Sequence, residues 1–359
     1  MKMPRPKSGS GFTLTELMIA MAVGLIVMGA LATLFKSGMD SAMIVTQRAE
    51  TQQNMRAAID LMVKDISMAG AGLPSGGIQL PTGAGSSSSL YGCDQSGTCH
   101  VSGNTYPTNN YMYGIIPGFS NGVEGNAVVP AAPPPAVNDS ITSIYTDYNF
   151  PLWQYNVTFP VPGNGTAITL MPNGAFVPAP PALTAAGGIK VGDLIMLSNP
   201  LGTAVGEVTN VTPAEIEFAN LDPLNMNQSG AASNNIAAIS TGANTIAYRL
   251  FAVTYYLTVP PPNGETPRLM RQVNGQTPVP VADNIINLQF SYDVYNSTTS
   301  QLDPNQTNPL GAGDSPNLMQ KINIVVMGQS IINHGNKSQN LYLATSVSAR
   351  NMAFRNRYQ

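Results

Sequence analysis

Charge is the property that this sequence has least of. Only 10% of its 359 residues are charged, whereas roughly 25% is usual in soluble globular proteins. The 16 basic and 19 acidic side chains give a net charge of -3, so no cationic excess exists to bind nucleic acid broadly. The apolar fraction of 43% argues against a wholly disordered chain. Glycine (34) and proline (29) are abundant instead, which favours turn-rich structure.

Cysteine and histidine are scarce as well. The two cysteines, Cys93 and Cys99, lie in one short stretch, and only His100 and His334 could join them around a metal ion. Because a zinc site normally needs four ligands, we expect a disulfide between Cys93 and Cys99. Such a bond would place this part of the chain outside the reducing cytosol. Two free thiols in a loop are the alternative.

Catalytic motifs are also missing. The sequence contains no Gly-x-Ser-x-Gly, His-Glu-x-x-His, Walker loop or dinucleotide-binding fingerprint. With two histidines and few carboxylates, neither a hydrolytic triad nor a pair of catalytic acids is expected. The sequence therefore predicts a protein that is not an enzyme and that needs no cofactor.

The N-terminus combines a basic segment with a long apolar run. Lys2, Arg5 and Lys7 precede the segment Leu17–Phe35, which contains no charged residue. That length can cross a bilayer as a helix, and the basic flank marks the cytoplasmic side. A secretory signal peptide has a similar start, but here the helical pattern continues with no proline before Pro74.

The pattern beyond Phe35 is that of an amphipathic helix. Apolar residues recur at steps of four, three and four, while charged residues recur at steps of four on the other side. The apolar set is Met55, Ile59, Met62 and Ile66, and the charged set is Arg56, Asp60 and Lys64. Glycines at 70 and 72, followed by Pro74, are typical of a helix end. We therefore expect one helix from about residue 13 to about residue 68.

Glu16 is the single ionisable residue near the start of the apolar segment. An acid in such a place is costly and usually has a defined partner or function. The alternative is that its carboxylate lies at the level of the lipid headgroups, near the positive end of the helix dipole.

The segment Gly11-Phe12-Thr13-Leu14-Thr15-Glu16-Leu17, followed by an apolar run, resembles the class III leader and N-terminal segment of type IV pilins. The resemblance implies that prepilin peptidase cleaves after Gly11 and methylates the new N-terminal residue, Phe12. It also implies that Glu16 recruits the incoming subunit during assembly. A carboxylate four residues from the new amine would compensate its charge inside an apolar helix bundle.

The same resemblance implies an organisation for the whole chain. Residues 1–11 would be the leader, and residues 12–68 the N-terminal helix. Within that helix, 12–35 would be the transmembrane segment and filament core, and 36–68 the amphipathic part. Residues 69–359 would form a β-rich periplasmic or extracellular head. The expected location is a single-pass inner-membrane protein before assembly and the extracellular pilus afterwards.

Strand-like runs follow one another in the second half of the sequence. Their short connections favour antiparallel pairing, so we expect an α+β protein of type IV pilin fold, with the long helix packed on an antiparallel sheet. Residues 75–120, rich in Gly, Ser and Asn, are expected to form loops. The predicted strands cover 140–145, 155–159, 193–197, 204–209, 245–256, 285–292, 322–327 and 342–348.

Several of these segments resemble the PilW class of minor pilins. They lie at 65–70, 191–197, 249–256, 267–271 and 346–358. The resemblance implies a structural minor pilin that helps to initiate pilus assembly at or near the tip. Its partners would be other minor and major pilins, prepilin peptidase and the inner membrane before assembly, with a tip adhesin as a further candidate. A type II secretion pseudopilin and a pilin-anchored adhesin that uses residues 75–190 are the alternatives.

Two polar clusters complete the candidate sites. Asp303, Asn305, Thr307 and Asp314 partly match the ligand spacing of a calcium-binding loop, although the central glycine and the final glutamate are absent. A polar, turn-rich loop is the alternative. The second cluster, Arg350, Arg355 and Arg357, could contact an acidic partner or simply form a solvated chain end.

Overall fold

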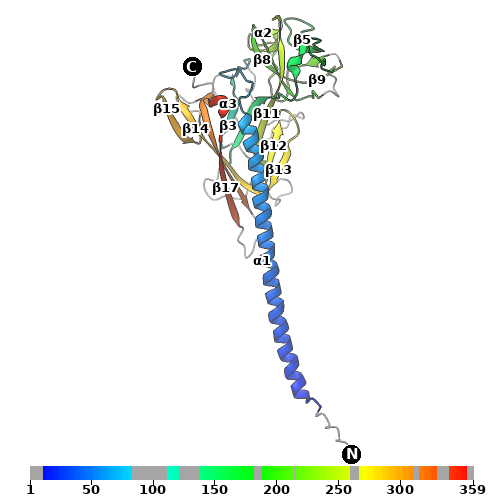
Figure 1. The fold of residues 1–359 in the computed structure, drawn as a ribbon, viewed down its shortest axis with the longest axis vertical. Coiled ribbons are helices and arrows are strands. Elements are labelled where there is room, and N and C mark those ends of the chain that lie inside the picture. The colour runs from blue at the N-terminus through cyan, green and yellow to red at the C-terminus, as the bar shows by residue number, and fades with distance from the viewer. Residues whose placement is uncertain are drawn as a thin grey trace, which may run out of the picture. The chain divides into compact units, whose positions relative to one another are not determined.

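The longest element is the helix α1, Leu14–Met68, which is drawn in blue in Figure 1. The computed structural model describes residues 11–82, 111–120, 138–181, 188–213, 215–258, 267–309, 315–329 and 339–353. No proline interrupts α1, and it stops before Gly70, whose φ of 79° is the left-handed conformation common just after a helix. The long N-terminal helix predicted from the sequence is confirmed.

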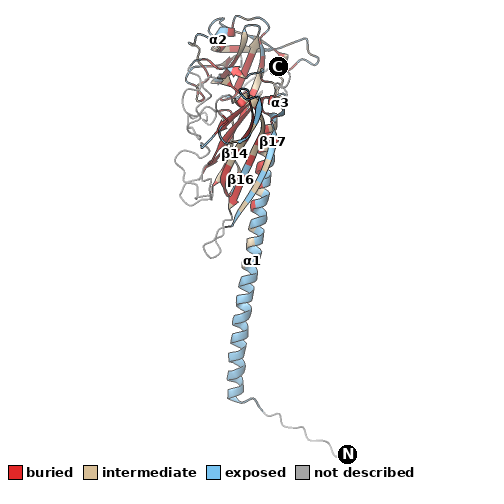
Figure 2. Cartoon of the chain, turned by 90° about the vertical axis from the view of Figure 1, so that its left-hand side faces the viewer, coloured by how far each residue is buried: buried red, intermediate tan, exposed pale blue. Residues whose placement is uncertain are grey.

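The two ends of α1 belong to different units of the chain, Met1–Glu50 and Thr51–Gln359. In the first unit, residues 11–39 are all exposed, as the pale blue helix in Figure 2 shows. In the second unit, one face of the helix is buried, and Arg56, Asp60 and Lys64 are exposed on the other side. The buried face begins at Thr51 and continues through Met55, Ala58, Ile59, Met62, Asp65 and Ile66.

Antiparallel strands form the rest of the described second unit, in two large and two small sheets. The larger of the two large sheets has the order β13-β12-β11-β4-β3, and β7 joins β11 to β8. Its strands are β3 (Ile115–Gly118), β4 (Ser140–Thr146), β7 (Leu194–Asn199), β8 (Gly202–Glu207), β11 (Ile246–Thr258), β12 (Arg268–Val273) and β13 (Val279–Asp283).

The other large sheet has the order β15-β14-β16-β17. Its strands are β14 (Ile285–Asn296), β15 (Gln301–Gln306), β16 (Met319–Gln329) and β17 (Asn340–Ser348). The small sheets consist of β5 (Tyr155–Thr158), β6 (Ala167–Pro172), β10 (Ile216–Glu217) and β9 (Asn210–Val211), and of β1 (Ile78–Gln79) with β2 (Tyr111–Met112). Short helices are α2 (Ile236–Ile239), α3 (Arg350–Ala353), η1 (Leu152–Gln154) and η3 (Pro316–Leu318).

The main core lies between the second half of α1 and both large sheets. Met62 and Ile66 of the helix pack in one cluster with Tyr255 of β11, Leu288 of β14 and Ile324 of β16. A second cluster includes residues of β1, β2, β7 and β8 with the remaining face of β11. A third fills the lobe formed by β5, β6, β10 and α2. The helix face predicted from sequence is thus the face that packs into the main core.

All eight predicted strands are present, with ends that shift by a few residues. The α+β class and the antiparallel sheets are therefore confirmed. The expectation that residues 75–120 form loops only was wrong, because β3 lies there, with Ile115 and Ile116 both buried. The Gly- and Ser-rich composition around this short apolar run hid the strand from sequence reasoning. In the fold, β3 pairs antiparallel with β4.

Candidate functional site

Three reciprocal hydrogen bonds between Thr13 and Glu16 cap the start of α1. The backbone N–H of Thr13 donates to Oε2 of Glu16 at 2.9 Å, and Oγ1 of Thr13 donates to the same oxygen at 2.8 Å. The N–H of Glu16 in turn donates to Oγ1 of Thr13 at 3.4 Å. This is a capping box, which satisfies backbone donors that a helix start leaves free.

The capping box explains how Glu16 is held in this chain. Its carboxylate lies in the first turn, where the backbone N–H groups and the helix dipole favour negative charge. The first helical hydrogen bond, from the N–H of Leu17 to the carbonyl oxygen of Thr13 at 3.2 Å, fixes the same turn. The Ser/Thr-x-x-Glu spacing was visible in the sequence, and it is the signal by which the role of Thr13 could have been found.

Gly11 and Phe12 lie directly before this cap and outside any helix or strand. The Phe12 side chain is 88% exposed, and no heavy atom lies near the position that a Cβ on Gly11 would take. An extended, accessible peptide bond is what a peptidase requires of its substrate. The bond between Gly11 and Phe12 therefore meets the steric requirement for cleavage, which a bond inside α1 would not.

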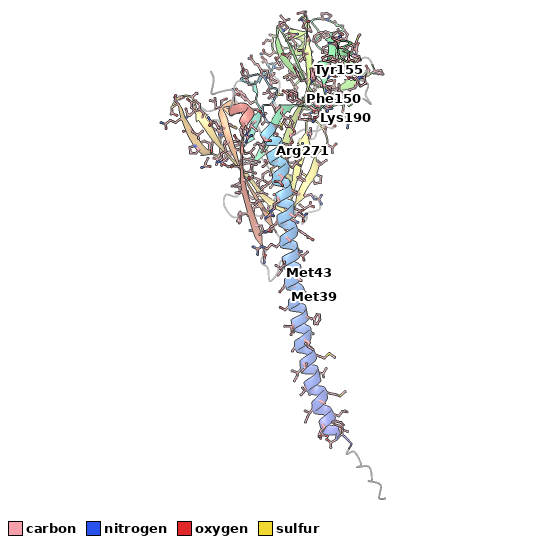
Figure 3. The ribbon with its side chains drawn as sticks, in the orientation of Figure 1. Met39, Met43, Phe150, Tyr155, Lys190 and Arg271 are labelled. Carbon is pink, nitrogen blue, oxygen red and sulfur yellow. The ribbon has the colours of Figure 1, made fainter. Side chains whose placement is uncertain are left out.

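The apolar segment that follows is exposed along its length. It includes Leu25 and Phe35, both 74% exposed, and Met39 and Met43 lie on the helix surface in Figure 3. Within the described part of the chain, α1 is the one helix long and apolar enough to cross a membrane. Apolar surface on this scale indicates a site of contact with lipid or other apolar helices.

Asp65 is a buried site that the sequence reasoning did not identify. Its carboxylate accepts hydrogen bonds from Tyr145 Oη at 2.9 Å, Tyr255 Oη at 2.5 Å and Arg271 Nε at 2.8 Å. These partners come from β4, β11 and β12, and Figure 3 marks Arg271 beside α1. Burial, and then the charge of Asp65, raise the pKa of both tyrosines.

The pKa of Arg271 is also raised. Burial alone would lower it, but the hydrogen bond to Asp65 and the charge of that carboxylate outweigh the burial. The guanidinium therefore stays positive against the only helix carboxylate that faces the described core. The group joins α1 to three neighbouring strands, so its chemistry is structural.

A second buried acid, Glu207, lies at the end of β8. Its Oε2 atom accepts a hydrogen bond from the N–H of Leu224 at 2.9 Å. Burial, and then the neighbouring carboxyl of Asp222, raise the pKa of Glu207 to about 9. Glu207 is therefore protonated at neutral pH in the folded protein.

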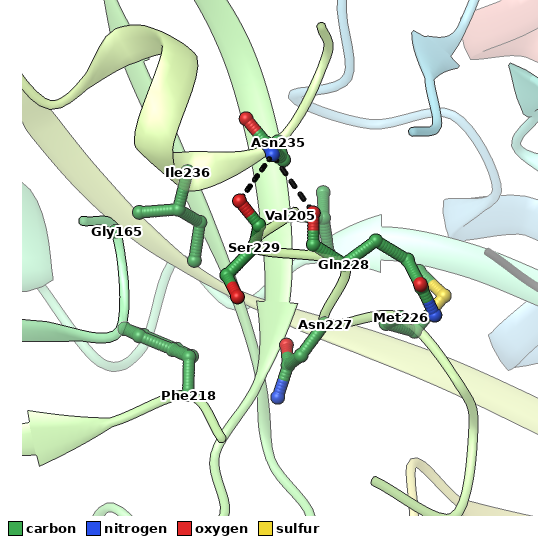
Figure 4. A pocket seen from close by; sticks show the side chains of 9 residues that line it. All are labelled: Gly165, Val205, Phe218, Met226, Asn227, Gln228, Ser229, Asn235 and Ile236. Carbon is green, nitrogen blue, oxygen red and sulfur yellow. Dashed lines mark hydrogen bonds between the residues drawn. The ribbon is translucent and has the colours of Figure 1, made fainter. Parts of the chain in front are cut away.

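The lobe around α2 contains a cavity, shown in Figure 4. Phe218, Asn227 and Ile236 are among the residues that line it, and its volume is about 10 Å³. Asn235 is satisfied within the chain, because its Nδ2 atom donates to the carbonyl oxygens of Gln228 and Ala231 at 2.8 and 2.9 Å. The cavity has room for about one water molecule, so it is not a binding site for a small organic ligand.

The calcium candidates are divided between different contacts. The carboxylate of Asp303, in β15, accepts a hydrogen bond from the Asn296 amide at 2.8 Å. Asn305 accepts one from Asn323 and donates its N–H to Asp293. Thr307 follows the end of β15, and Asp314 lies outside the described residues. Within the described ranges, no group of three or more His, Cys, Asp or Glu residues could hold a metal ion.

Other candidates from the sequence lie outside the described residues. They are Cys93, Cys99, His100 and His334, the leader positions 1–10, and Arg355 and Arg357 of the basic cluster. Arg350 is exposed at the first residue of α3. The disulfide between Cys93 and Cys99 therefore stays a prediction.

Comparison with known proteins bears on the N-terminus. Residues 7–32 match the family model of the prokaryotic N-terminal methylation motif, a range that includes Gly11, Phe12 and Glu16. No curated protein and no solved structure matches the chain significantly. The motif indicates a prepilin-like leader and a protein of type IV pilin-like or pseudopilin character, consistent with membrane anchoring before assembly.

Proposed function

We propose that this chain is a structural minor pilin of a type IV pilus, similar to the PilW class. It is inserted in the inner membrane, cleaved after Gly11 by prepilin peptidase and methylated on Phe12. It then enters the filament through its apolar helix, contributes to the initiation of assembly and lies at or near the tip. Its role is structural rather than enzymatic.

One observation carries the proposal. The proposed cleavage point, the bond between Gly11 and Phe12, lies within the matched methylation motif. It is exposed and non-helical, and it comes immediately before the capped start of an apolar helix of membrane-spanning length. A peptidase can reach this bond without unwinding α1. The product has an N-terminal helix that is apolar on all sides from Leu17 to Phe35, as packing among other helices requires.

The capping box supports the proposed role of Glu16. Cleavage would create an amine on Phe12, one residue before the Thr13 N–H that already contacts the Glu16 carboxylate. In an apolar filament core, an amine without a counter-charge would be costly. Glu16 can compensate the amine of its own chain or of a neighbouring subunit. The head-to-tail interface of such helices does not close on itself, so it extends as a helical filament.

N-terminal mass spectrometry of the full chain, extracted from membranes and from sheared filaments, tests the proposal. The expected result is a chain that begins at methylated Phe12. A Gly11→Val variant should remain uncleaved and should accumulate in the membrane, because the bulky side chain blocks processing. A wild-type chain that retains Met1 in both fractions would overturn the proposal.

The secretion pseudopilin is the second candidate, because the same motif serves both systems. A deletion strain separates the two. A pilus subunit predicts loss of pili with secretion intact, whereas a pseudopilin predicts loss of protein secretion with pili intact.

One surface feature favours the alternative function of a pilin-anchored adhesin that uses residues 75–190. Trp153 is 41% exposed and packs edge-to-face on Phe176, with 5.4 Å between the ring centroids. Both residues lie within 75–190, and exposed aromatic groups are common in binding surfaces. A Trp153→Ala variant that assembles normally but fails to attach to a surface would favour this function. Unchanged attachment would leave the minor pilin as the better conclusion.

A further inference from the structure

The outer strands of the two large sheets differ in how their edges are protected. Among the described strands of these sheets, β3, β8, β13, β15 and β17 each pair on one side only. β3 and β8 are short, with four and six residues, and short edge strands offer little to a pairing partner. β13 contains Pro280 and has a register shift against β12, and β15 contains Pro304 and has a register shift against β14. Prolines and bulges of this kind prevent an edge from pairing with another chain.

β17 has none of these features. Its nine residues, Asn340–Ser348, include no proline and no charged residue. They pair with β16 in one continuous register, from Gln329 opposite Asn340 to Lys321 opposite Ser348. A long, regular and uncharged edge is the type that accepts a further strand.

The hydrogen-bonding pattern identifies the groups that are free to pair. The N–H of Ala349 donates to the carbonyl oxygen of Gln320 at 2.9 Å, and the register with β16 is unbroken from there. Because antiparallel residues alternate between the two edges, Leu341, Leu343, Thr345 and Val347 bond to β16. The backbone groups of Asn340, Tyr342, Ala344, Ser346 and Ser348 point the other way.

The same five residues are exposed, and Figure 2 shows β17 in pale blue and tan along most of its length. Tyr342 is the most prominent side chain, at 62% exposed. Within the described chain no strand lies on this side of β17. Among the described residues, the outward backbone groups of β17 are therefore not paired with another strand.

The direction of β17 restricts its partner. At one end, Gly328, which is opposite Leu341, lies so close to Met55 of α1 that a Cβ there would be 2.8 Å from the Met55 sulfur. Beyond the other end, the Asn351 amide donates to the carbonyl oxygen of Ser67 at 3.2 Å. β17 thus runs along residues 51–68 of α1 in the direction of the helix.

Two copies of β17 paired antiparallel would place their neighbouring helix segments antiparallel. Subunits that leave one membrane in the same orientation cannot do this. We propose that the open edge of β17 binds an uncharged, extended strand of a neighbouring, different pilin subunit whose helix runs parallel to α1. The proposal rests on the proposed function, and it adds a sheet-to-sheet contact to the contact between helices.

Site-specific photo-crosslinking tests the contact in assembled filaments. p-Benzoylphenylalanine at Tyr342 of the full chain should crosslink to another pilin subunit, and mass spectrometry should map the product to a strand segment of that subunit. Leu302, which is 47% exposed on the protected strand β15, is the control position and should give little product. Equal yields at both positions, or a product that contains two copies of this chain, would overturn the proposal.

A backbone variant tests the hydrogen bonds themselves. Ala344→Pro removes an outward N–H and leaves the ladder between β17 and β16 intact, whereas Ala344→Ser keeps the N–H. The proline variant should enter filaments about tenfold less than wild type, as expected for the loss of about one hydrogen bond with added steric conflict. The serine variant should assemble normally.

A charged variant, Ala344→Lys, provides the same test if Ala344→Pro fails to fold. The lysine should also lower incorporation, because a charge on the edge opposes strand addition. Wild-type processing at Phe12 is measured in the same strains. If wild type is cleaved and incorporated and the folded variants are incorporated equally, the edge proposal fails while the proposed function stands. If wild type never enters filaments, the proposed function itself fails.

Discussion

Arg271 Nε lies 2.8 Å from Asp65 Oδ2, although 206 positions separate the two residues in the chain. Asp65 lies on the buried face of α1 and Arg271 on β12. Only 4% of the Asp65 side chain and 22% of the Arg271 side chain are exposed. The pair therefore connects the helix to the larger of the two large sheets from inside the core, with Tyr145 and Tyr255 as additional donors.

Asp65→Asn should lower the free energy of unfolding by about 3 kcal/mol, because it leaves the Arg271 cation without its counter-charge in a half-buried position. Urea unfolding of the full chain in detergent micelles, followed by circular dichroism, measures the change. Asp60→Asn, on the exposed side of the same helix, is the matched control and should change stability by less than about 0.5 kcal/mol. Similar losses in the two variants would contradict a specific role of the pair.

Glu16→Ala should reduce the incorporation of the chain into filaments by at least about tenfold, because no carboxylate would remain to balance the Phe12 amine. Membrane insertion should be unaffected, since removing a charge does not oppose insertion of an apolar helix. Immunoblots of sheared filaments and membrane fractions give both quantities. Glu16→Asp retains the charge on a shorter side chain and should recover part of the incorporation. Normal incorporation of the alanine variant would exclude the proposed role.

Gly70→Ala should destabilise the fold by about 2 kcal/mol. Gly70 has a φ of 79°, which costs an L-residue about 1–2 kcal/mol, and a Cβ there would lie 2.8 Å from Cγ of Met352. Gly76→Ala is the control, because its φ is 89° but no atom lies near the added Cβ. The difference between the two variants in thermal unfolding measures the contact with Met352. Equal losses would show that only the backbone conformation matters.

Glu207 should make stability fall as pH rises from about 4.5 to about 9. Its pKa is about 9 in the folded protein, against an ordinary value of 4.5, so the folded state holds a proton that the unfolded state has released. The contribution of the protonated Glu207 carboxyl to the free energy of unfolding is complete below pH 4.5. It is lost as pH rises through about 9, by up to about 1.4 kcal/mol per pH unit within this window. Glu207→Gln should flatten the dependence of the melting temperature between pH 6 and 9. A parallel decrease in both proteins would be evidence against a protonated Glu207.

The elements that could be predicted from the sequence are those with a regular period. The 3–4 spacing of Met55, Ile59, Met62 and Ile66 identified the buried helix face, and alternating or continuous apolar runs identified eight strands. Two of the strands that were not predicted contain a proline: β13 contains Pro280, and β15 contains Pro304 within a polar stretch. Proline is tolerated there because both strands lie at sheet edges.

The functional and buried sites also differ in how far they could be predicted from the sequence. Gly11, Phe12 and Glu16 are close in sequence, so their relationship is visible without a structure. The partners of Asp65 lie 80, 190 and 206 positions away, and no local pattern can bring them together. A signal was nevertheless present, because Asp65 interrupts an otherwise apolar helix face between Met62 and Ile66, and a buried acid requires donors.

The position of Asp65 near the end of α1 also has a mechanical consequence. In the proposed filament, a subunit that is held by its N-terminal helix and pulled at its head would receive the tension through α1. Asp65 accepts hydrogen bonds from side chains of β4, β11 and β12. A pull on the helix at this point would therefore load these hydrogen bonds together rather than one after another. The buried carboxylate would therefore distribute the force over three strands of one sheet.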